Sequence, residues 1–267
     1  MTAFITPLLF MVASCVTHLP KSTLSANYNL NSTLWIQTSS EYRANSIQTF
    51  NSARRELRLA IEDNVAEKVS TLPFGIIMDI DESVLDNSQY QAKLILNNRN
   101  YDADSWDKWI SLKVAPPVPG AVDFINYAVD MGVQVIFITN RKCRTRINGG
   151  ASCPQKQETL QNLSDVGISG LLDKNLLLKS ERPEWTSEKE NRRQDIYSKY
   201  HIIMLFGDDL GDFLPDVRKN ITANQRKKLV LENKEKWGVT WFMLSNPTYG
   251  SWERVLPEPK HSNLNGY

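Results

Sequence analysis

The sequence lacks an excess of either charge. Its 267 residues contain 31 Lys and Arg against 30 Asp and Glu, which leaves a formal net charge of +1. A protein with this balance has no overall field that attracts nucleic acid, so we expect no nucleic-acid partner and local binding of any anion. Residues 218–236 are rich in lysine, but Glu232 and Glu235 lie within the same segment. This mixture is typical of a solvated helix face.

The chain also lacks an apolar run of the ~20 residues that a membrane-spanning helix needs. Residues 3–14 are almost wholly apolar and lead into Val12-Ala13-Ser14-Cys15, which is similar to a bacterial lipobox. We expect a signal peptide over residues 1–15, a lipid on Cys15 and a polar tether over residues 16–31. These features predict attachment to the membrane of a bacterial cell envelope, as an outer-membrane lipoprotein, or a periplasmic location. A buried helix or a plain secretory signal is the alternative, because no Lys or Arg precedes the apolar run.

Cysteine is scarce as well. Besides Cys15, the chain has only Cys143 and Cys153, and the segment between them contains two glycines. An oxidising compartment would allow this pair to form a disulfide, and two free thiols are the alternative. A zinc site is disfavoured, because neither histidine nor a further cysteine lies nearby in the sequence.

The order of apolar segments predicts one α/β domain over residues 32–267. Short apolar runs with β-branched residues are typical of buried strands, and the segments between them have helical character. The repeated order of strand and helix implies a parallel sheet with helices on both faces. We expect strands at 74–78, 133–139, 171–178, 202–206 and 239–244, and helices at 119–131, 154–166 and 188–199.

Two other segments are expected to form a small helical cap. Residues 32–70 carry apolar side chains at mostly helical spacing without Pro or Gly, which predicts one long helix or two shorter ones. Residues 97–117 interrupt the order of strand and helix and contain Trp106 and Trp109. The cap would therefore consist of the N-terminal helices and residues from about 90 to 118.

Polar and charged residues follow four of the expected strands, and the carboxyl ends of parallel strands meet at one edge of a sheet. Carboxylates packed there would repel one another unless a cation joined them, and a donor set of oxygens favours Mg²⁺. The sequence therefore predicts a magnesium site. The residues are Asp79, Asp81, Glu82 and Ser83, then Thr139, Asn140 and Arg141, then Lys179, and finally Asp208, Asp209 and Asp212.

Two of these strand ends resemble the signatures of a known family. The stretch 77–90 reads Ile-Met-Asp-Ile-Asp-Glu-Ser-Val-Leu-Asp-Asn-Ser-Gln-Tyr and closely resembles the first signature of bacterial class C acid phosphatases. The stretch 203–213 reads Ile-Met-Leu-Phe-Gly-Asp-Asp-Leu-Gly-Asp-Phe and resembles their second. The family belongs to the haloacid dehalogenase (HAD) superfamily, and its best-known members are lipoproteins of the e(P4) type that act on 5′-nucleotides. The resemblance implies a HAD-like fold and Mg²⁺-dependent hydrolysis of small phosphomonoesters.

The resemblance also implies roles for individual residues. Asp79 would be the nucleophile that forms an aspartyl-phosphate, and Asp81 would protonate the leaving oxygen and then activate water. The chain departs from the family pattern at Ser83, where Thr is usual, and at Asp209, where Asn or Thr is usual. We expect Asp209 to add a negative charge beside the metal. The implied metal-binding residues are Asp79, Asp81 through its carbonyl, Asp208 and Asp212, and the implied phosphate-binding residues are Thr139, Asn140, Arg141 and Lys179.

Substrate preference is predicted from two aromatic residues. Trp106 in the expected lid and Tyr249 after the last strand resemble the aromatic pair with which the family holds a nucleobase or nicotinamide ring. We therefore expect 5′-nucleotides to be preferred. Packing within the lid is the alternative for both residues, and it is the expected role of Trp109 and Trp252.

Two other functions are compatible with the sequence. A HAD phosphatase for sugar or aryl phosphates is the nearest alternative, and a non-catalytic surface binding protein is the other. The presence of Asp79 favours catalysis. A histidine acid phosphatase is excluded, because the three histidines occur without an Arg-His-Gly motif. The sequence leaves the oligomeric state open.

Overall fold

The computed structural model of the protein describes residues 29–67, 70–147 and 149–267. The predicted signal peptide, Cys15 and most of the predicted tether lie outside the described residues. The end of the tether was placed wrongly, since Leu30 and Asn31 form the start of helix α2 (Leu30–Thr38). The helix begins there because the carbonyl of Asn29 already accepts a hydrogen bond from Thr33 N at 2.9 Å. No helix in these ranges is long and apolar enough to cross a membrane.

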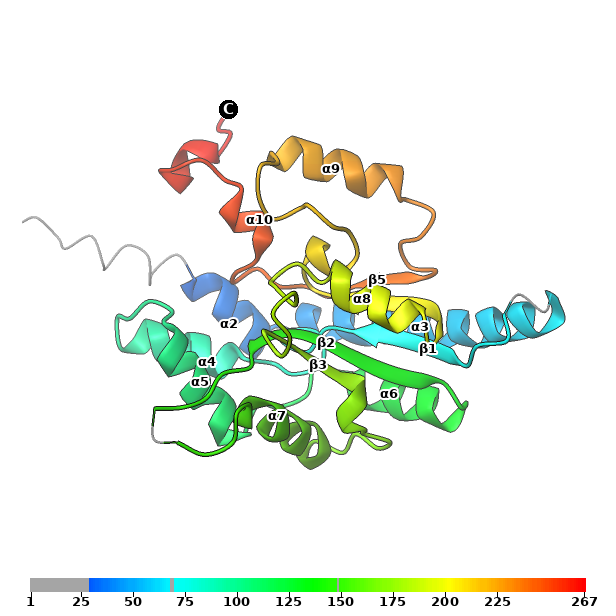
Figure 1. Cartoon of the computed structure of the whole chain (residues 1–267). Coiled ribbons are helices and arrows are strands. Elements are labelled where there is room, and N and C mark those ends of the chain that lie inside the picture. The colour runs from blue at the N-terminus through cyan, green and yellow to red at the C-terminus, as the bar shows by residue number, and fades with distance from the viewer. Residues whose placement is uncertain (1–28, 68–69, 148) are drawn as a thin grey trace, which may run out of the picture.

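A sheet of five parallel strands lies at the centre of the domain, in the order β3-β2-β1-β4-β5 (Figure 1). The predicted α/β class with a parallel sheet is therefore confirmed. Buried apolar side chains on both faces explain why these segments form the strands of a parallel sheet. The strands are β1 (Phe74–Met78), β2 (Gln134–Lys142), β3 (Leu176–Lys179), β4 (His201–Gly207) and β5 (Trp241–Met243).

Two strands are shorter than predicted. β3 begins five residues late, because Asp173–Asn175 forms the 3-10 helix η1 and Asn175 N donates to Leu172 O at 2.9 Å. β5 also begins late, because the amides of Val239 and Thr240 both donate to the carbonyl of Lys236 in a turn. Apolar composition identified both strands, whereas local turn hydrogen bonds decided where they start.

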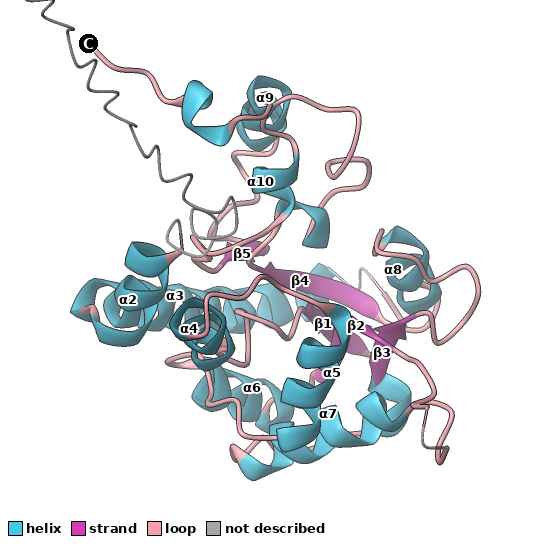
Figure 2. Cartoon of the chain, turned by 90° about the vertical axis from the view of Figure 1, so that its left-hand side faces the viewer, coloured by secondary structure: helices cyan, strands magenta, loops and turns pink. Residues whose placement is uncertain are grey.

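Helices cover both faces of the sheet. On one face, α3 (Ser40–Glu67), α6 (Ala121–Asp130) and α7 (Pro154–Asp165) contribute Phe50, Phe124 and Leu163 to the larger core. On the other face, α8 (Glu190–Tyr197) contributes Ile196 to a smaller core around Trp185 and Trp241. Figure 2 shows α6 and α7 on one side of the sheet and α8 on the other. The sheet is thus buried on both faces, as a parallel sheet requires.

The C-terminal part of the chain adds helices beside β5. The lysine-rich segment forms α9 (Ala223–Glu232), in which only Arg226 is buried and Lys228 pairs with Glu232 on the surface. The prediction of a solvated helix face is confirmed. The remaining elements are the short helix α10 (Ser251–Arg254) and the 3-10 helices η2 (Leu210–Asp212) and η3 (Lys260–Asn263).

Of the segments predicted to form the cap, α2, α4 (Ser88–Leu96) and α5 (Ala103–Leu112) are short helices, whereas the 28-residue helix α3 packs against α6 on a face of the sheet. The N-terminal segment forms two helices, α2 and α3, because Ser39 between them is extended at φ −80° and ψ 138°. α2 lies against α4, and α5 lies against α7. Asp102 caps α5 by accepting hydrogen bonds from Asp104 N and Ser105 N.

The segment between β2 and α7 connects this cap to the main domain. Cys143 and Cys153 are joined there in a disulfide, with their Cα atoms 4.8 Å apart. Between them, Arg146 pairs with Asp107 on α5 at 2.7 Å and with Glu158 on α7 at 2.5 Å. The cap is therefore held by charged contacts across a segment that the disulfide closes.

Candidate active site

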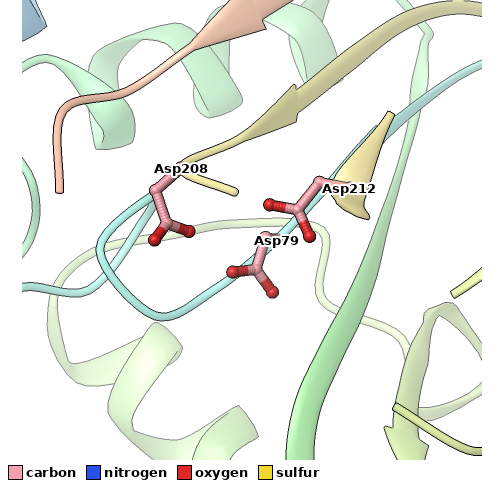
Figure 3. Close-up of side chains that lie close together, drawn as sticks. All are labelled: Asp79, Asp208 and Asp212. Atoms are coloured by element: carbon pink, nitrogen blue, oxygen red, sulfur yellow. The ribbon is translucent and has the colours of Figure 1, made fainter. Parts of the chain in front are cut away.

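Three aspartates meet at the carboxyl edge of the sheet (Figure 3). Asp79 follows β1, Asp208 follows β4, and Asp212 ends the 3-10 helix η2. Their nearest carboxylate oxygens all lie within 4.8 Å of one another. Gly207 permits this approach, because a Cβ built on it would lie 2.2 Å from Oδ2 of Asp212. The two strand ends that neighbour each other in the sheet thus bring together residues far apart in the sequence.

Lys189 is the cation at the centre of this cluster. Its Nζ lies 2.5 Å from Oδ1 of Asp79 and 2.6 Å from Oδ1 of Asp212, and its side chain is only 4% exposed. Lys189 was not among the predicted site residues, because these all lie directly after strands. Lys189 lies ten residues beyond the end of β3, at the N-cap position of α8. The only sequence signal was a lysine at the start of an expected helix.

The pKa values of two of the aspartates are raised. Burial raises the pKa of Asp79 to about 6, the charge of Lys189 limits the rise, and the charge of Asp212 adds to it. Burial also raises the pKa of Asp208 well above its usual range, with a further contribution from the charges of Asp79 and Asp212. These directions follow from placing carboxylates close together away from water.

Asp81 is oriented by residues from the main domain and from the cap. Arg141, which is 1% exposed, donates through Nε and a terminal nitrogen to Oδ1 of Asp81 at 3.0 and 2.8 Å. Thr139 Oγ1 donates to Oδ2 of Asp81 at 3.3 Å, and Asn87 Nδ2 donates to Oδ1 at 3.0 Å. Trp109 in turn donates to Asn87 at 2.7 Å, so its indole packs in the cap as expected. Arg141 and Thr139, predicted to hold phosphate, both contact Asp81.

Asn140 contacts the segment that carries Lys189. Its Nδ2 donates to the carbonyl of Ser187 at 3.1 Å, and its Oδ1 accepts from Arg192 at 2.8 Å. Arg192 is fully buried and also donates to the carbonyl of Thr139 at 2.5 Å. Burial lowers the pKa of Arg192 to about 10. The sequence analysis did not single out Arg192, which joins the end of β2 to the start of α8.

Asp209 does not add its charge to the metal cluster as expected. Its carboxylate accepts hydrogen bonds from Gly211 N at 2.8 Å and from Ser251 Oγ at 2.8 Å, and it lies 3.2 Å from Arg218. Burial alone would raise its pKa, but the charge of Arg218 and these hydrogen bonds lower it. The extra charge of Asp209 is therefore paired with Arg218. The carboxylate also connects Ser251 of the C-terminal segment to the loop after β4, residues 208–212, which we call the aspartate loop.

Asn246 makes a second connection between that loop and the C-terminal segment. Its Nδ2 donates to Oδ2 of Asp208 at 2.8 Å, while Ser83 Oγ donates to Oδ1 of the same aspartate at 3.3 Å. The Oδ1 of Asn246 accepts from Thr248 N at 3.0 Å. Tyr249 follows directly, so its position depends on residues that also contact Asp208 and Asp209.

A cavity of about 430 Å³ opens above these residues. Trp106 and Tyr249 both line it, as does Tyr101, which the sequence analysis missed. Trp106 packs edge-on against Tyr90, with ring centroids 5.0 Å apart. Trp252 does not line the cavity and is 40% exposed. Lys179 lines the cavity at the end of β3, but the ammonium that contacts Asp79 belongs to Lys189.

The donor set of the aspartate cluster fits a hard divalent cation. Asp79, Asp208 and Asp212 offer only carboxylate oxygens, and within the described residues they form one group of the size that holds a metal ion. Lys189 supplies one positive charge against three carboxylates, so negative charge remains among these four groups. A cation of charge two would balance it.

Comparisons with known proteins agree with this geometry. The family of HAD superfamily, subfamily IIIB acid phosphatases matches residues 19–252 of the chain. Two solved structures are similar to the chain: the class C acid phosphatase from Bacillus anthracis, and the class C acid phosphatase from Bacillus anthracis with tungstate bound. In each comparison the identity is 30%, the TM-score is 0.77, and the match covers 92% of this chain and 99% of the other. The predicted HAD-like fold is confirmed.

Proposed function

The chain belongs to the acid phosphatases of HAD subfamily IIIB and hydrolyses phosphomonoesters, and from this premise we propose that it uses Asp79 as nucleophile and prefers 5′-nucleotides. One observation carries the proposal. Asp79, which is 8% exposed, lines the same cavity as the more exposed Trp106 and Tyr249, so we take the carboxylate as the base of the cavity and the two rings as its outer part. A phosphate could bind beside Asp79, and a flat aromatic leaving group could lie against the rings of Trp106 and Tyr249.

The reaction needs two steps. In the first, an oxygen of Asp79 attacks phosphorus, and the bond to the leaving oxygen breaks as Asp81 gives that oxygen a proton. In the second, Asp81 takes a proton from a water molecule, which attacks phosphorus and releases Asp79 and inorganic phosphate. The contacts of Arg141 and Asn87 with Asp81 hold its carboxylate in place for both transfers.

Lys189 serves the first step by its contact with the nucleophile. Its ammonium lies 2.5 Å from Asp79, close enough to balance negative charge on a phosphoryl group held against that carboxylate. We assign to Lys189 the phosphate-binding role that the sequence analysis gave to Lys179. Asp79, Asp208 and Asp212, with the backbone carbonyl of Asp81, would hold a Mg²⁺ ion that supplies further positive charge to the phosphoryl oxygens.

Two observations support the proposal that the cavity binds an oxyanion and a flat leaving group. The similar structure from Bacillus anthracis was solved with tungstate, an oxyanion. Tyr90, Tyr101 and Trp106 form an aromatic group at the cavity, with the rings of Tyr101 and Trp106 6.5 Å apart. Stacking on such rings contributes roughly 1–3 kcal/mol per base. Phosphatase activity on sugar or aryl phosphates alone is the competing assignment.

A substrate panel tests the proposal. Purified protein would be assayed with 5′-AMP, p-nitrophenyl phosphate and glucose 6-phosphate, before and after exhaustive chelation with EDTA and again after addition of Mg²⁺. We expect the highest kcat/KM for 5′-AMP, loss of activity on chelation and recovery with Mg²⁺. Equal kcat/KM values for all three esters would reject the nucleotide preference, and full activity after chelation would reject the metal.

We also propose that Cys15 carries the lipid that attaches the protein to a membrane. The support is the sequence Val12-Ala13-Ser14-Cys15 after an apolar segment. Mass spectrometry of the protein from a bacterial membrane fraction should show acylation at Cys15. An unmodified Cys15, or cleavage at another residue, would contradict this proposal.

A further inference from the structure

Two cations, Lys179 and Arg254, line the cavity, and Lys142 lies beside Lys179; we refer to these three residues as the outer cation cluster. Lys142 and Lys179 are Cα partners where β2 and β3 end, and Cys143 N donates to Lys179 O at 2.8 Å. Lys179 and Arg254 line the same cavity as Asp79. The end of β3 and the C-terminal helix α10 thus bring positive charges to one side of the substrate cavity.

Most of the other cations that line the cavity are already paired, and the charge of the remaining one, Arg99, acts on Asp102 in the cap. Arg141 pairs with Asp81, Lys189 with Asp79 and Asp212, and Arg218 with Asp209. At the outer part, the neighbouring acid Glu253 pairs with Lys260. Within the described ranges, Lys142, Lys179 and Arg254 form no ion pair with any acid.

The cluster is close enough for its charges to act on one another. Burial lowers the pKa of Lys179, and the charges of Lys142 and Arg254 lower it further. The charge of Arg254 also acts on Tyr101, so Arg254 lies near the aromatic part of the cavity as well. Like charges held together without a counterion destabilise the protein, and an anion bound among them would remove that repulsion.

We propose that Lys179 and Arg254, with Lys142 beside them, form a second anion subsite that binds a phosphate on the leaving group. The substrate class would then include phosphomonoesters with a second phosphate, such as nucleoside 3′,5′-bisphosphates. Guanidinium and ammonium groups are the usual partners of phosphate, and a dianion matches several of them better than a carboxylate does. The inference rests on the proposed function for the position of the phosphate that is cleaved.

The inference is tested by comparing substrates that differ only in the second phosphate. Values of kcat/KM would be measured for adenosine 3′,5′-bisphosphate, 5′-AMP and p-nitrophenyl phosphate at low salt, with loss of the 5′-phosphate followed. We expect the wild-type protein to favour the bisphosphate over 5′-AMP by about tenfold, the usual size of a charge-assisted contact. Raising the ionic strength should reduce this ratio, since part of the cluster is exposed.

Variants show whether the cluster is responsible. Lys179→Gln and Arg254→Gln should each reduce the ratio of bisphosphate to 5′-AMP about threefold or more, mainly through KM, and the double variant should bring it near one. Lys174→Gln is the matched control, because Lys174 is an exposed lysine that precedes the opposite end of β3 and does not line the cavity. It should keep the wild-type ratio.

The measurements distinguish an error in the proposed second anion subsite from an error in the proposed function. A wild-type ratio near one, or a ratio that Lys179→Gln and Arg254→Gln leave unchanged, overturns the second anion subsite. If 5′-AMP is no better than p-nitrophenyl phosphate, the nucleotide preference fails, while the ratio of bisphosphate to 5′-AMP still decides the subsite.

Discussion

The base of the cavity and its outer part differ in how their charged side chains are paired. At the base, charged side chains follow strand ends, are largely buried, and form ion pairs or several hydrogen bonds, as Asp79 with Lys189 and Asp81 with Arg141 do. The outer part comes from the cap, the end of β3 and the C-terminal segment, and it combines aromatic rings with Lys179 and Arg254, which have no acidic partner in the described chain. In the proposed function, the base carries out the chemistry and the outer part selects the leaving group.

Two lysines show the same contrast at the scale of single residues. Lys189 is 4% exposed and lies between two carboxylates, so its charge is fixed beside Asp79, where the proposed function places the phosphate. Lys179 is half-buried at the end of β3, beside Lys142 and Arg254. Removing Lys189 leaves buried charges without a partner, whereas removing Lys179 relieves repulsion. We expect substitutions at the base to affect every substrate and substitutions at the outer part to affect some.

The largest effect should follow from replacing the nucleophile. Asp79→Asn keeps the size of the side chain but removes the attacking carboxylate, so kcat should fall by several orders of magnitude for all substrates. The fold should remain, because the amide relieves charge repulsion with Asp212. Steady-state assays and circular dichroism would check both points. Activity near that of the wild type in protein free of other phosphatases would refute the mechanism.

Lys189→Gln should have the next largest effect. Loss of a cation that balances developing charge typically costs about 100-fold or more in kcat. Asp79 and Asp212 would also lose their buried partner, which typically destabilises a protein by about 3–5 kcal/mol in the absence of a metal ion. Assays on several phosphomonoesters and thermal unfolding after chelation would measure the two effects.

Lys199→Gln provides the control for Lys189→Gln, because Lys199 is an exposed lysine just beyond the other end of α8. It should leave both kcat and stability close to those of the wild type. If Lys189→Gln reduced kcat/KM for nucleotides alone, Lys189 would belong functionally to the outer part of the cavity, and the division between the two regions would be wrong.

The sequence predicted the base of the cavity well, because a parallel sheet brings the ends of its strands together. Asp79, Asp81 and Asp208 could be placed from strand positions alone. Lys189 could not, because it reaches the cluster from the start of a helix. The partners of Arg141 and Asp209 depend on side-chain packing between segments distant in sequence, so their contacts with Asp81 and with Arg218 and Ser251 were not predictable.

Trp106→Ala should have a selective effect. Loss of a stacking ring costs roughly 1–3 kcal/mol per base, so kcat/KM for 5′-AMP should fall about tenfold. Hydrolysis of p-nitrophenyl phosphate should change less, because Trp106 lines the cavity, whereas the hydrogen bond to the nucleophile Asp79 comes from Lys189. Trp252→Ala is the control, since Trp252 lies outside the cavity lining. An equal loss on both substrates would show that Trp106 supports the catalytic base.

The smallest effect concerns how the cap is held. Asp107 on α5 accepts hydrogen bonds from Arg146 Nε at 2.7 Å and from Gln155 at 2.7 Å. Burial alone would raise the pKa of Asp107, but these hydrogen bonds and the charge of Arg146 lower it. A carboxylate with a lowered pKa in the folded state stabilises the protein above its unfolded pKa of about 4 and loses this contribution as the pH falls through the folded value.

Asp107→Asn should therefore lower the free energy of unfolding by about 1–2 kcal/mol at pH 7, toward the lower end for a charged hydrogen bond because Arg146 is partly exposed. The difference from the wild type should shrink as the pH falls below about 4, because Asp107 is then protonated in the unfolded state before it is protonated in the folded state, and it should vanish below the lowered folded pKa. Chemical denaturation at pH 7 and pH 3.5 would measure it. Asp104→Asn is the matched control on the same helix, because its carboxylate pairs with Arg144 while 88% exposed and should contribute little. A difference of equal size at both pH values would mean that shape and neutral hydrogen bonds, rather than charge, hold α5 against α7, and the cap would then be fixed in the same way at every pH.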